Sequence, residues 1–112
     1  MVDLDKKLKI CALADVYKNL LTPNQQQVLQ YYYYDDLSLF EIAENLGITR
    51  QAVLDTLKKA EASLTDYEAK CGILAQNAKL KQQLLDIANA AKNGKITPTQ
   101  IAQSLQQIID NI

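Results

Sequence analysis

The chain has 112 residues, of which 48% are hydrophobic and 22% charged, enough for one compact domain or for a small module with an extension. With 3 glycines, 2 prolines and an abundance of Ala, Leu, Gln and Lys, the composition favours a few long helices over strands. The formal net charge is −1, so the chain lacks the basic excess by which most free-standing DNA-binding domains neutralise phosphates.

The sequence contains few residues of the kinds that hold metals or carry catalysis. There is no histidine, and the two cysteines, Cys11 and Cys71, lie far apart and outside any CxxC pattern. The serines have no histidine base, and no glycine-rich phosphate loop is present. We therefore expect free thiols in a reducing compartment, no metal, no cofactor, no catalytic residue and no enzymatic activity.

Nothing in the sequence indicates a secreted or membrane protein. The stretch from Met1 to Lys9 alternates charged residues with short apolar ones, unlike a signal peptide. No run approaches the roughly 18 apolar residues that a transmembrane helix requires. We expect a cytoplasmic protein with no membrane insertion.

Two helices are expected in the first third of the chain. Apolar residues recur at helical spacing from about Leu4 to Leu20. Thr22 then offers an N-cap, Pro23 suits the first helical position, and Gln25 can complete a capping box. We expect this second helix to end before the acidic pair at residues 35 and 36.

Four consecutive tyrosines, Tyr31–Tyr34, lie near the end of the second predicted helix. Aromatic residues interleaved with basic ones would indicate stacking on bases, but no lysine or arginine is nearby. Only about half of four consecutive helical residues can face a core. We expect Tyr32 and Tyr33 in the core, with Tyr31 or Tyr34 half-exposed.

The segment from Leu37 to Leu57 has the pattern of a helix-turn-helix, with capping residues for its two helices at Ser38 and Thr49. Such a motif needs a small residue where its helices cross and a turn between them, which Ala43 and Gly47 supply. The apolar residues expected to fill the wedge between the helices are Ile42, Leu46, Ile48 and Val53.

Two further helices are expected beyond Gly72. Asn93-Gly94 would end the first of them, and Thr97-Pro98 repeats the capping pattern at the start of the last. Their apolar positions, with Asn77 in line, are Ile73, Leu80, Leu84, Ile87, Ala91, Ile101, Leu105, Ile108 and Ile112.

The chain should therefore be all-α, with a helix-turn-helix domain at 1–70 and a C-terminal helical hairpin or arm at 71–112. The apolar stripes of the arm could dock on the core, form a homodimer or accept a partner helix.

Two resemblances follow from these motifs. The residues similar to region four of sigma factors are Leu21-Thr22-Pro23, Val28-Leu29, Leu37-Ser38, Glu41–Thr49 and Val53. The residues that resemble the YlxM family of small bacterial helix-turn-helix proteins are Tyr31–Leu57, with Thr49–Val53 and Asp55, then Asp66-Tyr67-Glu68 and Lys70. The YlxM resemblance covers about Leu4 to Lys70. It implies an all-helical fold, nucleic-acid binding and, through gene neighbourhood, a role in the signal recognition particle pathway. A sigma factor itself is excluded by size.

The candidate nucleic-acid-binding residues lie on the second helix of the motif. Arg50 and Gln51 at its start can pair with guanine and adenine, and Lys58 and Lys59 can neutralise phosphates. Asp55 on the same helix would repel phosphates. The alternative is an ordinary solvated face in which Asp55 forms an ion pair with Lys58 or Lys59.

Two classes of function remain open. The first is a DNA-binding regulatory protein, with signal recognition particle components as candidate partners; an RNA contact would use the same face. The second is a protein–protein adaptor that uses the helix-turn-helix as a scaffold and binds no nucleic acid.

Overall fold

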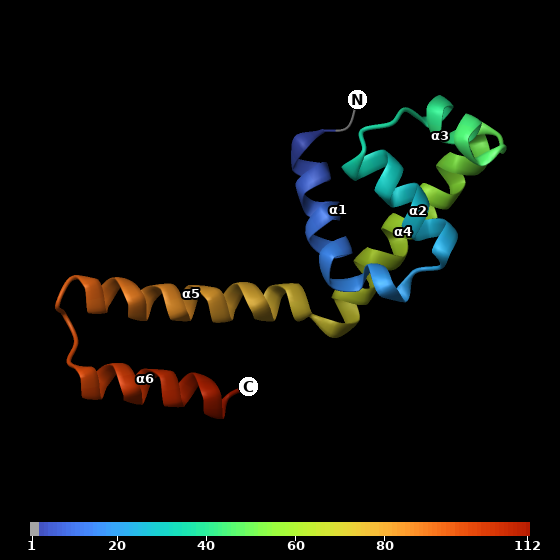
Figure 1. The fold of residues 1–112 in the computed structure, drawn as a ribbon. Helices are drawn as coiled ribbons and strands as arrows, with labels where there is room; N and C mark the ends of the chain where they lie inside the picture. Colours follow the sequence, from blue (N-terminus) through green and yellow to red (C-terminus); the bar gives the residue numbers. More distant parts are fainter. Residues whose placement is uncertain (1–2) are drawn as a thin grey trace. The chain divides into compact units, whose positions relative to one another are not determined.

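The computed structural model describes residues 3–112, and within them all regular structure is helical (Figure 1). The six α-helices are α1 Leu4–Tyr17, α2 Pro23–Leu29, α3 Leu39–Leu46, α4 Arg50–Cys71, α5 Ile73–Lys92 and α6 Pro98–Asp110. A 3₁₀ turn, η1 (Lys18–Leu20), follows α1, and a π-helical turn, η2 (Gln30–Tyr34), follows α2. The all-α prediction is confirmed. The helices form two compact units, one reaching Leu74 and the other spanning 75–112.

The helices begin where the sequence places capping boxes. Thr22, Ser38 and Thr97 each accept a hydrogen bond from the backbone N–H three residues later, and the side chain of that later residue accepts one in return. These reciprocal bonds satisfy N–H groups that a helix N-terminus otherwise leaves without partners. Gly47 and Gly72 end α3 and α4 in the left-handed conformation, with φ of 66° and 63°.

The first unit packs α1, α2, η2 and α3 against α4, whose buried residues lie in its N-terminal two-thirds. On α4 the buried residues follow a four-three-four spacing, which places them on one face of the helix: Val53, Leu57, Ala60 and Leu64. From the other elements, the core receives Ile10, Leu13, Ala14, Tyr17, Leu21, Val28, Leu29, Tyr33, Ile42 and Ala43. The core thus joins the two helices of the motif to the helices that precede it.

Three of the residues expected in the core differ from the prediction, and the first of them, Leu46, is only half-buried. Ile48 is 42% exposed, because it lies in the short link between Gly47 and the N-cap Thr49, where helical spacing does not set its direction. Tyr33 is buried as predicted, but Tyr32 is only half-buried. The ring of Tyr32 packs edge-on against that of Tyr33, with their centroids 5.0 Å apart, and covers it from outside.

The first unit extends past Lys70, where we expected it to end. The Tyr17 hydroxyl donates to the Glu68 carboxylate (2.6 Å) and accepts from the backbone N–H of Ile73 (3.1 Å). The same carboxylate oxygen accepts from the N–H of Leu74 (2.9 Å). These bonds hold the residues just after Gly72 to the first unit, and the boundary therefore falls at Leu74.

The second unit is a helical hairpin. Its helices α5 and α6 run side by side in opposite directions (Figure 1), and residues of both line one open groove near the C-terminus. No residue from 75 to 112 is buried. Among the described helices, none is both long enough and apolar enough to cross a bilayer.

Candidate nucleic-acid interface

The α3–α4 pair has the local geometry of a helix-turn-helix. After α3, the Ile48 N–H bonds back to the Ala43 carbonyl (3.1 Å), and Gly47 turns the chain. The Thr49 hydroxyl then accepts from the Ala52 N–H (3.0 Å) and starts α4. Ala43 is only 7% exposed, and its small side chain lets the two helices approach closely. In the first turn of α4, Arg50 and Gln51 are exposed to solvent, whereas Val53 is buried.

Electrostatic contacts reinforce the start of α3. The Ser38 N–H donates to the Glu41 carboxylate (3.0 Å), and this bond lowers the pKa of Glu41 below its ordinary value. A negative charge in the first turn also interacts favourably with the helix dipole. Ionised Glu41 therefore stabilises the start of α3 at neutral pH.

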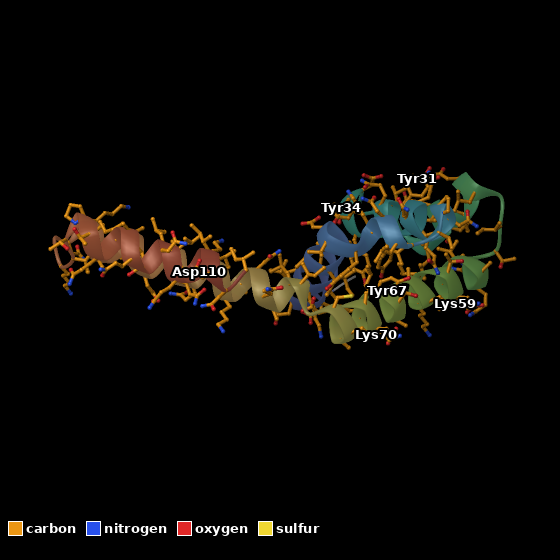
Figure 2. All side chains as sticks on the ribbon, turned by 90° about the horizontal axis from the view of Figure 1, so that it is seen from below. Tyr31, Tyr34, Lys59, Tyr67, Lys70 and Asp110 are labelled. Atoms are coloured by element: carbon orange, nitrogen blue, oxygen red, sulfur yellow. The ribbon has the colours of Figure 1, made fainter. Side chains whose placement is uncertain are left out.

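The four predicted binding residues are all exposed, but they do not form one patch. With about 3.6 residues per turn, Gln51 lies on the face of α4 opposite its buried side, and Lys58 and Lys59 border that face on its two sides. Figure 2 shows Lys59 on the side of α4 turned away from η2, which carries Tyr31 and Tyr34. Arg50 is rotated away from these three residues, toward the buried side of α4.

Arg50 lines a groove of about 830 Å³ that runs between the starts of α1 and α3. Apolar side chains contribute much of this groove, among them Tyr32 and Phe40. Lys7 also lines it, but it forms an ion pair with Asp36 (2.8 Å) that raises the pKa of Lys7. Arg50 is therefore the cation of this groove that has no ion pair among the described residues.

The carboxylate of Asp55 is hydrogen-bonded to a side-chain amide and forms no ion pair with any lysine that the structure describes. Its carboxylate accepts a hydrogen bond from the Gln51 side chain (2.9 Å), one helical turn earlier. The ion pairs within residues 3–112 involve other residues, so the predicted pairing of Asp55 with Lys58 or Lys59 is absent. Lys58 and Lys59 have no ion pair among the described residues, whereas the side-chain amide of Gln51 is held by Asp55.

Helix α1 adds basic side chains beside Lys58. A groove of about 650 Å³ between α1 and α4 is lined by Lys6, Lys9 and Lys58. Lys6 forms an ion pair with Glu61 (3.4 Å), and Glu61 also accepts a hydrogen bond from the buried Tyr33 hydroxyl. Burial, together with this bond to a carboxylate, raises the pKa of Tyr33. Lys9 and Lys58 are therefore the cations of this groove with no ion pair within the described part of the chain.

The comparisons with known proteins agree with this geometry. The family described as "Putative helix-turn-helix protein, YlxM / p13 like" (UPF0122) matches residues 4–108. The chain belongs to this family. A UPF0122 protein of Shouchella clausii is 38% identical over 109 residues, which cover 97% of this chain and 95% of that protein. One from Halalkalibacterium halodurans is 44% identical over 87 residues (78% and 80%), and one from Desulforamulus reducens 48% over 81 residues (72% and 69%).

The YlxM resemblance inferred from the motifs is thereby confirmed, and the family match continues beyond Lys70, where the motifs end. The sequence analysis did not identify Lys6 and Lys9 as candidate binding residues. Their proximity to α4 depends on the packing of helices about fifty residues apart. Their spacing could have indicated a basic surface, because two lysines three residues apart lie on the same face of a helix.

Proposed function

We propose that this member of the YlxM-like family binds duplex DNA through its helix-turn-helix and acts as a regulatory protein. The observation that carries the proposal is the solvent-exposed first turn of α4, which presents Arg50 and Gln51 directly after the turn at Gly47. In helix-turn-helix proteins the N-terminal residues of the second helix contact base edges in the major groove. Arginine pairs with guanine and glutamine with adenine in that groove.

The electrostatics predict weak binding with a modest dependence on salt concentration. Residues 1–70 hold 8 basic and 11 acidic side chains, a net charge of −3. Attraction to phosphates therefore comes from local cations, namely Lys9, Lys58 and Lys59, and not from the overall charge. Such local contacts release few counterions, so the affinity should fall with salt along a shallow but clear slope.

Fluorescence anisotropy of the full chain with a labelled duplex of mixed sequence tests the proposal. We expect the logarithm of the association constant to fall linearly with that of the salt concentration, by about 0.9 for each phosphate that the protein neutralises. A titration without binding at low salt, or binding indifferent to salt, would contradict the proposal. If binding is found, selection from a random duplex pool then identifies the preferred sequence.

Replacing Asp55 with asparagine should strengthen the interaction. The change removes a carboxylate from the exposed face of α4 and weakens the acceptor that holds the Gln51 amide. We expect affinity for the labelled duplex to rise about fivefold at low salt, since an opposing charge near a phosphate costs on the order of 1 kcal/mol. Asp86→Asn is the matched control, because Asp86 lies in α5 and likewise accepts a hydrogen bond from the glutamine one turn earlier, Gln82 (2.8 Å). An equal gain from both variants would mean that only net charge matters.

On the strength of the family resemblance, we further propose that the regulatory role belongs to the signal recognition particle pathway. Titration of the particle's RNA against the protein, with tRNA as competitor, tests whether the same Lys58 and Lys59 face binds that RNA. Competition by tRNA at equal strength would count against a specific RNA contact.

The second candidate function is a protein–protein adaptor. The net charge of −1 and the exposed apolar residues of α5 and α6 favour it. Pull-downs from lysate with and without nuclease distinguish the candidates: partners that persist after nuclease treatment support the adaptor, and their loss supports nucleic-acid binding.

A further inference from the structure

The exposed cations of α4 are distributed unequally over the two sides of the helix. At about 3.6 residues per turn, Arg50 and Lys58 lie on one side of α4, and Lys59 lies on the other. Helix α1 packs against the first of these sides, because residues of α1 line both the groove that contains Arg50 and the groove that contains Lys58. We call this side, with Arg50 and Lys58, the α1 flank.

Helix α1 adds a further cation to the α1 flank from outside the helix-turn-helix. Lys9 is exposed and lines the same groove of about 650 Å³ as Lys58. Within residues 3–112, Asp5, one turn before Lys9 on α1, neither pairs with Lys9 nor lines this groove. The charge of Lys9 therefore lies next to that of Lys58 without a carboxylate bound to it.

Both carboxylates that line this groove already have partners. Glu61 forms an ion pair with Lys6 (3.4 Å) and accepts a hydrogen bond from the Tyr33 hydroxyl. Asp66 forms an ion pair with Lys70 (2.9 Å). An incoming phosphate thus meets two lysines without an ion pair, while the negative charges of the groove are balanced by other groups.

The opposite side of α4 offers fewer positive charges. The described residues of α4 place Lys59 there as the cation without an ion pair, since Lys70 is held by Asp66. A helix that lies in the major groove has one strand of the duplex on each side, because the groove is about as wide as the helix itself. The two strands would therefore meet different numbers of cations.

We propose that α4 holds the two strands of its duplex unequally, with Lys58 and Lys9 both contacting phosphates of the strand on the α1 flank. Lys59 contacts the other strand, and Arg50 adds its contact with a base edge or phosphate on the α1 flank. This unequal grip rests on the duplex binding proposed above. It makes α1, which lies outside the helix-turn-helix, part of the DNA interface, so the bound stretch of one strand extends beyond the bases that α4 reaches.

Neutralising the phosphates of one strand at a time tests the proposal. In a duplex of the selected sequence, uncharged methylphosphonate linkages replace the phosphates of one strand or of the other, and anisotropy gives the affinity of the full chain. We expect one substituted strand to reduce affinity about fivefold more than the other, the effect of one additional lysine–phosphate contact. In Lys9→Ala this difference between the strands should disappear.

Substitutions at Lys9 supply the second measurement, on the unmodified duplex. We expect Lys9→Ala to reduce affinity about fivefold and to make the salt slope shallower by about 0.9, the value for one phosphate. Lys9→Arg keeps the charge and should retain both quantities. Lys18→Ala is the matched control, because Lys18 is an exposed lysine in η1, directly after α1, and lines neither groove of the α1 flank. It should leave the salt slope and the difference between the strands unchanged.

The outcomes separate this proposal from duplex binding itself. Equal losses for the two substituted strands, or a difference that persists in Lys9→Ala, overturn the unequal grip while duplex binding stands. Equal effects of Lys9→Ala and Lys18→Ala on the salt slope also overturn it. Circular dichroism reports whether the variants keep their helices. A wild-type chain that binds no duplex overturns both proposals.

Discussion

Replacing Ile42 with alanine should lower the free energy of unfolding of the first unit by about 2–5 kcal/mol. Ile42 is fully buried where α3 meets the core, and its loss removes three methyl or methylene carbons and leaves a cavity between the helices of the motif. Because the cavity lies at the support of α4, we expect DNA binding to weaken as well. Urea unfolding followed by circular dichroism measures the effect.

The same substitution at Ile48 is the control. Ile48 belongs to the same motif but is 42% exposed, so Ile48→Ala should cost less than about 1 kcal/mol. A cost at Ile48 as large as that at Ile42 would mean that the link after Gly47 packs inward, as the sequence pattern alone suggested.

The double variant Arg50→Ala with Lys58→Ala should reduce affinity for duplex DNA by about a hundredfold. In the proposed function, Arg50 at the start of α4 contacts a base edge or phosphate, and Lys58 adds a cation in the groove shared with α1. We also expect the salt dependence to become shallower by about one unit of slope for each phosphate that the variant no longer neutralises. Anisotropy titrations at several salt concentrations measure both quantities.

Lys18→Ala with Lys70→Ala is the matched control, because it changes the net charge equally. Lys18 lies in η1, and Lys70 forms an ion pair with Asp66 (2.9 Å) near the end of α4. Figure 2 shows Lys70 well along the helix from Lys59. We expect this control to change affinity only slightly. Equal reductions in the two double variants would show that charge, and not the exposed turn of α4, determines binding.

The sequence predicts helix boundaries well where the chemistry is local. A capping box needs two residues three positions apart, so Thr22, Ser38 and Thr97 could be recognised without knowing the fold. The left-handed glycines at the ends of α3 and α4 follow from the same local reasoning.

Features that depend on packing could not be predicted in the same way. The direction of Ile48 is set by the turn after Gly47, and the partial exposure of Tyr32 by the ring of Tyr33 beneath it. The approach of Lys9 to Lys58 requires α1 to pack against α4. For the candidate site, the sequence predicted the residues on α4 but not their separation into an outer face and a groove.

The hydrogen bonds of Tyr17 and Glu68 have a consequence for the order in which the chain folds. They occupy the N–H groups of Ile73 and Leu74, which a helix of this kind otherwise satisfies with its own capping residue. The acceptors come from α1 and from late in α4 and are brought together by the core. Helix α5 is therefore started by acceptors that exist only once α1 and α4 have met, and its first turn should melt whenever those two helices separate.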